Sequence, residues 1–321
     1  MPNPSPEFAA ELANWGPAAR SSPPTLDVSQ AYCRRIATGH YENFPVVSVL
    51  LPKPLQQHFY NVYSWCRWAD DLGDEVGDTT RALELLAWWR EEITACYAGQ
   101  GSHPVTVALA ETIREFQIPQ QPFLDLISAF EQDQTVLEYD NCDQLFDYCR
   151  RSADPVGRLV LHLCRQARPE NFGWSDSICT GLQLANFWQD VARDYDIHRV
   201  YLPREDRERF GYTAEQLARR ETNSAFLELM RFEVARARKL LSPWSGPGEP
   251  ELRVFPLRVQ IDLELFARGG ERILDRIEGI GYRVWDQRPK VTKWDVVRLF
   301  ARCVTHALIR PFRGRASASP F

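Results

Sequence analysis

The chain has 321 residues, 44% of them hydrophobic and 25% charged, which is enough to bury a large core as one large domain or two small ones. Its net charge is −5 and no basic block dominates it, so nucleic acid is disfavoured as the main partner. The sequence has no stretch of about 18 uncharged apolar residues, so we expect no transmembrane span. The start of the chain lacks the basic and apolar regions of a signal peptide.

Prolines recur through residues 1–27, so we expect a flexible arm there. Strand signals are nearly absent from the rest of the chain, and segment 242–250 is the clearest loop. Residues 309–321 are expected to be a disordered tail. We therefore expect a single all-α domain over residues 28–308. Helical periodicity covers roughly residues 28–38, 44–51, 54–75, 79–99, 104–117, 120–137, 143–152, 155–167, 172–195, 222–243, 250–280 and 291–308.

Eight cysteines are spread along the chain without a C-x-x-C pair, and most of them fall in apolar helical patterns. We interpret them as reduced core residues of a cytosolic protein. The same spacing disfavours a zinc site.

A narrow polar stripe is predicted on the helix over residues 54–75. Each residue of an α-helix advances about 100°, so positions i, i+4 and i+7 share a face. The residues within roughly 40° of Tyr63 on this helix are Arg67, Asp70 and Asp74. Trp65, Trp68 and Leu72 make much of the remaining surface apolar.

A second polar stripe is predicted on the helix over residues 172–195. The residues within roughly 60° of Gln183 are Asn186, Asp190 and Asp194. Phe187, Trp188 and Val191 surround this stripe with apolar surface. Both helices therefore invert the usual pattern, in which the polar face is broad and solvated.

Carboxylates are costly to bury without a compensating charge, so two such stripes favour a bound cation. Oxygen ligands without His or Cys suit Mg²⁺, which commonly binds a few carboxylates together with substrate phosphates. Two facing stripes would then hold a diphosphate through bridging metal ions. The alternative is ordinary salt bridging along solvated faces. A di-iron site is excluded, because none of the six His residues follows a Glu by three positions.

Several segments resemble, in the right order, the motifs of the head-to-head isoprenyl diphosphate synthases, the family of squalene and phytoene synthases. Residues 61–74 (NVYSWCRWADDLGD) resemble its first aspartate-rich motif. Residues 148–157 (YCRRSADPVG) resemble its Y-C-x-x-x-A-x-x-V-G segment. Residues 183–194 (QLANFWQDVARD) and 199–203 (RVYLP) resemble its second aspartate-rich motif and the R-x-Y-x-P extension. The likeness covers most of the chain between its two ends.

The resemblance implies an isoprenoid-synthase helical bundle around a deep apolar cavity. It implies several Mg²⁺ ions bridging the diphosphate, and ionisation of an allylic or cyclopropylcarbinyl diphosphate to a carbocation. The metal ligands that it implies are Asp70, Asp74, Asp190 and Asp194, assisted by Asn186.

The chain departs from the common family pattern near residues 40–48 (HYENFPVVS). Glu42 stands where a basic side chain would help to bind a second diphosphate, which favours an enzyme that binds one diphosphate in each turnover. Together with residues 66–75 (CRWADDLGDE) and 148–163 (YCRRSADPVGRLVLHL), this run resembles most the bacterial hydroxysqualene synthase branch of hopanoid biosynthesis. That branch acts as a carbon–oxygen lyase. It ionises presqualene diphosphate, rearranges it and captures the cation with water. We expect no nicotinamide cofactor, since no G-x-G-x-x-G fingerprint occurs.

Other motif residues receive roles from the same resemblance. His40, Arg67, Asn186 and Arg199 would contact the diphosphate. Phe44 and Phe187 would line the cavity. For each of these residues an ordinary structural role is the alternative, such as an i,i+3 ion pair between Arg67 and Asp70. The residues expected near the reacting carbon atoms are Tyr63, Arg67, Tyr148, Gln183 and Tyr201.

Two other functions stay open. A condensing synthase of the same fold would make presqualene diphosphate, squalene or phytoene from farnesyl or geranylgeranyl diphosphate. A helical interaction protein would be expected to lose its metal ligands, yet all four motif aspartates are present. The expected partners are presqualene or farnesyl diphosphate and other enzymes of the squalene and hopanoid pathway. So apolar a substrate is compatible with a cytoplasmic protein that contacts the inner membrane transiently.

Overall fold

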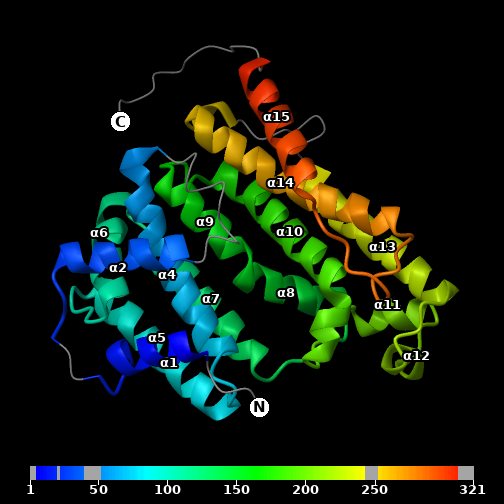
Figure 1. The fold of residues 1–321 in the computed structure, drawn as a ribbon, viewed down its shortest axis with the longest axis horizontal. Coiled ribbons are helices and arrows are strands. Elements are labelled where there is room, and N and C mark those ends of the chain that lie inside the picture. The colour runs from blue at the N-terminus through cyan, green and yellow to red at the C-terminus, as the bar shows by residue number, and fades with distance from the viewer. Residues whose placement is uncertain (1–4, 20–21, 40–51, 243–251, 310–321) are drawn as a thin grey trace.

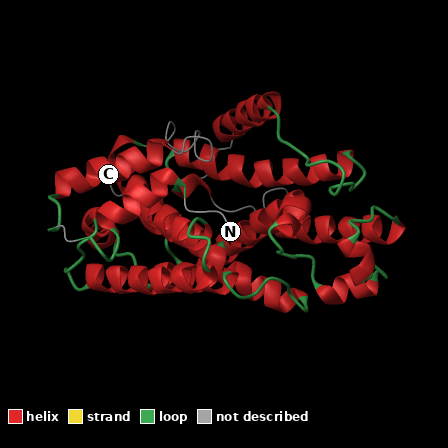
Figure 2. Cartoon of the chain, turned by 60° about the horizontal axis from the view of Figure 1, so that its bottom comes forward, coloured by secondary structure: helices red, strands yellow, loops and turns green. Residues whose placement is uncertain are grey.

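The computed structural model describes residues 5–19, 22–39, 52–242 and 252–309, and within them every regular element is a helix (Figure 2). The only strand-like feature of these residues is an isolated bridge between Glu138 and Val200. The all-α prediction is confirmed. The elements are α1 (Pro6–Trp15), α2 (Leu26–Gly39), α4 (Lys53–Asp74), α5 (Thr79–Tyr97), α6 (Pro104–Phe116), α7 (Gln121–Asp133), α8 (Cys142–Ser152), α9 (Asp154–Leu163), α10 (Pro169–Asp196), α11 (Arg204–Arg209), α12 (Ala214–Ala218), α13 (Ser224–Leu241), a 3₁₀ turn (Leu252–Val254), α14 (Leu257–Gly279) and α15 (Lys293–Ile309).

Two hydrophobic clusters organise the bundle. One gathers α2, α4, α5 and α6 around the stacked indoles of Trp65, Trp68 and Trp89. The other gathers α8, α10, α13 and α14 around Trp188 and Phe226. Figure 1 shows these groups on opposite sides of the molecule, with α9 between them. The two helices that carry the polar stripes, α4 and α10, therefore belong to different clusters.

Helix boundaries follow local chemistry. Proline occupies one of the first two positions of α4 and of α10, where its missing N–H costs nothing. Asp78 and Asn141 accept hydrogen bonds from backbone N–H groups in the first turns of α5 and α8. Thr213 and Gln216 form a capping box at α12.

Glycines set how closely the helices around α10 approach one another. A Cβ atom added at Gly157 on α9 would lie 2.5 Å from the Ser175 Oγ atom of α10. One added at Gly270 on α14 would lie 2.6 Å from the Leu182 Cδ2 atom. Only a residue without a side chain permits these approaches. The glycine of the YCRRSADPVG segment thus has a packing role.

The structure differs from the sequence predictions in several places. Part of the segment expected to be a flexible arm forms α1, because the Ser5 hydroxyl caps it, Pro6 starts it and Phe8 is buried against α4. The alternating charges from Arg204 to Arg209 predict a solvated helix. The run is helical, as α11, but its Arg207 side chain is buried. The helix expected over 44–51, the tail and most of the 242–250 loop lie outside the described residues.

All eight cysteines are free, and six of them are buried, as predicted. No helix in the described parts of the chain is long and apolar enough to cross a membrane.

Candidate active site

The polar stripe of α4 is built around an arginine. Arg67 lies 2.5 Å from an Asp71 oxygen and 3.5 Å from an Asp70 oxygen. Its Nη2 atom also lies 3.4 Å from the Glu75 Oε1 atom. The expected i,i+3 ion pair between Arg67 and Asp70 is therefore present. The closer partner of Arg67 is Asp71, which lies about 100° around the helix from Asp70 and so to one side of the stripe. Asp70 and Asp74 keep 43% and 52% of their side chains exposed.

The polar stripe of α10 ends in two aspartates with different surroundings. Asp190 forms a bidentate ion pair with Arg288, which lies between α14 and α15. The amide of Gln189 donates to the Pro289 carbonyl at 2.7 Å and so holds this connection against α10. Along the same helix Gln183 is half-buried and Asn186 is exposed.

Arg199 joins the two stripes. It follows α10, and its backbone N–H donates to the Asp194 carbonyl at 2.8 Å. Its guanidinium reaches across to Asp74 on α4, where Nη2 lies 3.2 Å from Oδ1. Burial raises the pKa values of Asp70, Asp133 and Asp194, and the positive charge of Arg199 acts against each of these rises. One cation therefore lies among carboxylates from α4, α7 and α10.

A stack of aromatic rings lies beside these charges. The rings of Phe187 and Tyr201 are nearly parallel, with centroids 3.7 Å apart. Tyr148 packs on both of these rings, and Tyr139 packs on Tyr148 and Tyr201. The Tyr148 hydroxyl donates to the Asp133 Oδ2 atom at 2.9 Å. All four rings are buried. The structure thus brings together three of the residues predicted to be near the reacting carbon atoms or in the cavity wall.

The carboxyl groups of the site are held in unfavourable surroundings for negative charge. Partial loss of water at Asp70, whose side chain stays 43% exposed, and the neighbouring Asp74 charge raise the pKa of this carboxyl. Burial raises the pKa of Asp133 to about 7. Burial and the charge of Asp190 raise the pKa of Asp194 to about 7. The arginines present do not fully compensate these carboxylates, so a further cation would be stabilised here.

The residues present fit Mg²⁺ held jointly with a phosphate-bearing ligand. No group of three or more His, Cys, Asp and Glu side chains capable of holding a metal ion by itself occurs in the described residues. The candidate donors are pairs of carboxylates at i and i+4, together with the Asn186 amide. Mg²⁺ retains water and binds one or two carboxylates plus substrate phosphates. Such a site is completed by its ligand.

The predicted roles of His40, Phe44 and Tyr63 stay predictions. His40 and Phe44 lie outside the described residues. Tyr63 is half-buried on α4, and burial raises the pKa of its hydroxyl. A small cavity beside Phe187 and Tyr201 also touches Asp194 and Arg199. The deep apolar cavity that the resemblance implies stays a prediction.

Three residues of the site were missed by sequence reasoning: Asp133, Tyr139 and Arg288. Asp133 ends α7 inside a Gln-Asp-Gln run, and a lone polar run at a helix end gives no sign of burial. Arg288 lies in a connection whose path only the fold determines. The position of Tyr139, between α7 and α8, depends in the same way on how those helices pack.

Comparisons with known proteins find relatives by sequence and by fold. The sequence model described as squalene/phytoene synthase matches residues 37–295. A phytoene synthase from Arthrospira platensis is 32% identical over 289 residues, covering 85% of this chain and 91% of that protein. A hydroxysqualene synthase from Rhodopseudomonas palustris is 32% identical over 254 residues, covering 77% and 84% respectively. The solved structure of the squalene synthase HpnC from Alicyclobacillus acidocaldarius is 41% identical, with a TM-score of 0.75, covering 80% of this chain and 95% of that one.

Proposed function

Because the chain belongs to the squalene/phytoene synthase family, we propose that it is a hydroxysqualene synthase. The family uses a divalent metal and acts on prenyl diphosphates. In the proposed reaction, the carbon–oxygen bond of presqualene diphosphate breaks and diphosphate leaves. The cyclopropane of the resulting cation rearranges, and water adds to the cation and loses a proton. The products are hydroxysqualene and diphosphate, so the enzyme would be a carbon–oxygen lyase.

The observation that carries a diphosphate-ionising function is the position of Arg199 between the two aspartate-bearing helices. It pairs with Asp74 of α4 while its backbone is bonded to Asp194 of α10. When a diphosphate binds there with metal ions, Arg199 would contact its negative oxygens, and the carboxylates of both helices would contact the metal ions. Arg67, held by Asp71, would present a second guanidinium from α4.

Mg²⁺ would be held by Asp70, Asp74, Asp190 and Asp194, with Asn186. Bound there, the ions would neutralise the charge that develops on the leaving diphosphate.

The aromatic stack would face the other half of the substrate. The negative faces of Tyr148, Tyr201 and Phe187 stabilise positive charge on carbon as they stabilise other cations. The Tyr148 hydroxyl is bonded to Asp133, so its ring is fixed in place. Burial of all these rings excludes bulk water from the path of the cation, which limits capture to the intended step.

The choice of presqualene diphosphate rests on two observations. Glu42 stands where a basic side chain would help to bind a second diphosphate. The likeness to the hydroxysqualene synthase from Rhodopseudomonas palustris, at 32% identity, supports it, and the phytoene synthase from Arthrospira platensis is equally similar, at 32%. The second candidate is a condensing synthase that makes presqualene diphosphate, squalene or phytoene. That phytoene synthase relative, which aligns with 85% of this chain, favours it.

Product analysis separates the two candidates. Purified protein with Mg²⁺ is incubated with presqualene, farnesyl or geranylgeranyl diphosphate, in separate reactions. We expect a C30 alcohol and free diphosphate from presqualene diphosphate, and no condensation product from the other two substrates. A C30 product from farnesyl diphosphate alone, or a C40 product from geranylgeranyl diphosphate alone, would assign the condensing activity. Asp70→Ala serves as the control and should abolish either activity.

A further inference from the structure

The last helix, α15, packs on α14 at the edge of the molecule (Figure 1). Its inner face carries Asp295 and Cys303, which are buried. His306 lies on the same face, and its Nδ1 atom is 2.9 Å from the Glu264 Oε1 atom of α14. The orientation of α15 about its own axis is therefore defined at both ends.

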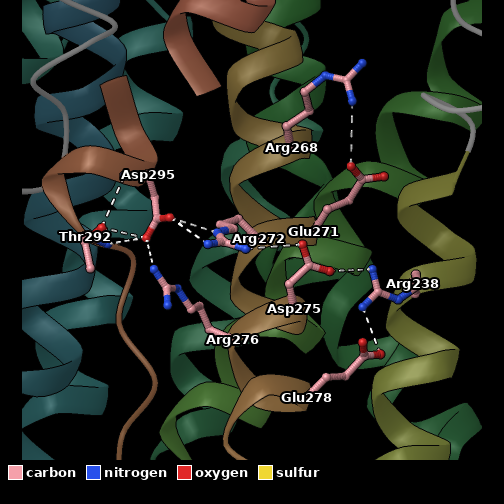
Figure 3. A network of polar contacts seen from close by, with 9 residues as sticks. All are labelled: Arg238, Arg268, Glu271, Arg272, Asp275, Arg276, Glu278, Thr292 and Asp295. Carbon is pink, nitrogen blue, oxygen red and sulfur yellow. Dashed lines mark hydrogen bonds and ion pairs between the residues drawn. The ribbon is translucent and has the colours of Figure 1, made fainter. Parts of the chain in front are cut away.

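A network of charges fixes the start of this helix (Figure 3). The Asp295 carboxylate accepts hydrogen bonds from Arg272 at 2.7 Å and from Arg276 at 2.6 Å, both on α14. It also accepts from the Thr292 backbone and hydroxyl at 2.8 Å. The bond from Arg276, with those from Thr292 and Arg272, holds the pKa of Asp295 well below its usual range. This contact holds α15 to the domain.

The outer face of α15 is apolar. At about 100° per residue, five residues opposite the inner face fall in a strip roughly 80° wide. We call this the outer strip: Trp294, Val297, Ala301, Val304 and Leu308. Trp294 is 73% exposed, Leu308 is 66% exposed and Val297 is 56% exposed. A helix packed on one side of a core normally turns its polar face outward. The outer strip is instead an exposed apolar patch, which is typical of a surface that binds a partner or a membrane.

The surroundings of the outer strip are basic. Residues 287–309 contain five Lys and Arg but only one acidic residue, Asp295, whereas the whole chain has a net charge of −5. Asp295 is already paired with two arginines of α14. The side chains of Lys293, Arg298 and Arg302 on α15 are exposed. Positive charge therefore surrounds an apolar strip at one edge of an acidic protein.

We propose that α15 docks the enzyme on the surface of an anionic lipid bilayer. The outer strip would lie at the boundary of headgroups and acyl chains, while Lys293, Arg298 and Arg302 would contact anionic headgroups. Charge complementarity favours lipid over a second copy of the chain, since two copies meeting here would bring their basic residues together. The purpose of this docking rests on the proposed function, because a C30 substrate and product partition into a bilayer.

Vesicle co-sedimentation of the full chain tests the proposal. We expect the wild type to bind phosphatidylcholine vesicles that contain phosphatidylglycerol, to lose affinity as salt rises, and to bind pure phosphatidylcholine weakly. The double variant Trp294→Ser, Leu308→Ser should bind at least about tenfold more weakly. The triple variant Lys293→Gln, Arg298→Gln, Arg302→Gln should lose about fivefold for each charge removed, on anionic vesicles only.

Val28→Ser is the matched control, because Val28 is 54% exposed on α2 and lies outside α15. It should bind as the wild type does, and all variants should keep the wild-type melting temperature. Equal binding by the wild type and the strip variants would overturn the proposal. So would a concentration-dependent dimer that only the strip variants lose, since that result assigns the strip to a second copy. Vesicle binding requires neither substrate nor metal, so its failure is distinguishable from a failure of the proposed reaction.

Discussion

At the scale of single residues, the buried carboxyl of Asp133 lowers the stability of the fold when it is ionised. It is 9% exposed, and its acceptor oxygen is bonded to the Tyr148 hydroxyl. Burial raises the pKa of Asp133 from 3.8 to about 7. The charge of Arg199 acts against this rise. The carboxylate therefore orients a tyrosine of the aromatic stack while it disfavours folding when it is ionised.

This gives a pH dependence whose sign is fixed. Between pH 4 and pH 7 the native protein holds a proton on Asp133 that the unfolded chain has released, so the free energy of unfolding falls as pH rises through this window. Asp133→Asn removes the titration. Relative to the wild type, the free energy of unfolding of the variant should rise by about 3–4 kcal/mol between pH 4 and pH 7, and the difference should stay constant above pH 7. Denaturant unfolding at several pH values measures this.

The matched control is Asp147→Asn, at a carboxyl on α8 that is 51% exposed. Its free energy of unfolding should follow the wild-type pH dependence. If Asp133→Asn also runs parallel to the wild type at every pH, the buried carboxyl is not the group that titrates.

At the scale of elements, the contact between α10 and α14 depends on one of two adjacent glycines. A Cβ atom at Gly270 would meet the Leu182 Cδ2 atom at 2.6 Å, whereas one at Gly269 would meet nothing within 4 Å. Both glycines lie inside the same helix, so replacement of either by alanine gives the same gain in helix propensity.

The pair of alanine variants isolates the steric part of this contact. Gly269→Ala should stabilise the protein by about 0.5–1 kcal/mol. Gly270→Ala should be less stable than Gly269→Ala by about 1–3 kcal/mol, because Leu182 and Leu241 must move. Equilibrium unfolding of both variants measures the difference. Equal stabilities would show that α10 and α14 adjust at no cost.

The elements also show what the sequence alone could predict. The spacing of Asp70, Asp74, Asp190 and Asp194 was sufficient to place two polar stripes on two helices, because helical geometry is local. The sequence could not predict the ion-pair partners of Arg199 and Arg288, since the partners of a loop arginine depend on which helices the fold brings near it. The prolines near the start of the chain predict a flexible arm, but Pro6 begins the α1 helix, because proline fits the first turn of a helix.

At the scale of the whole molecule, the candidate site lies between the two hydrophobic clusters. Asp70 and Asp74 project from a helix of one cluster, and Asp190 and Asp194 from a helix of the other. A ligand that contacts both sets of carboxylates would therefore link the clusters. It would bind the native state alone and stabilise the entire fold.

This coupling predicts a shift in melting temperature that does not depend on turnover. Mg²⁺ together with inorganic diphosphate, at about 100 times their joint dissociation constant, should add about 2.7 kcal/mol to the free energy of unfolding. Differential scanning calorimetry should show an increase of a few degrees for the wild type. Asp70→Ala and Asp190→Ala should each remove most of the increase.

Asp275→Ala is the control, since it deletes a carboxylate of α14 that pairs with Arg238 instead (Figure 3). It should keep the wild-type increase. A similar increase in all four proteins would place the binding of diphosphate elsewhere on the surface.

The ion pair between Arg199 and Asp74 gives the free enzyme an internal counter-ion. Without it, carboxylates from three helices would repel one another across the joint between the clusters. In the proposed function the diphosphate would become the partner of Arg199 and the metal ions would become the partners of the carboxylates, so each charge of the site would keep a partner in both states. Arg199 would thus hold α4 to the end of α10 in the interval between one substrate and the next.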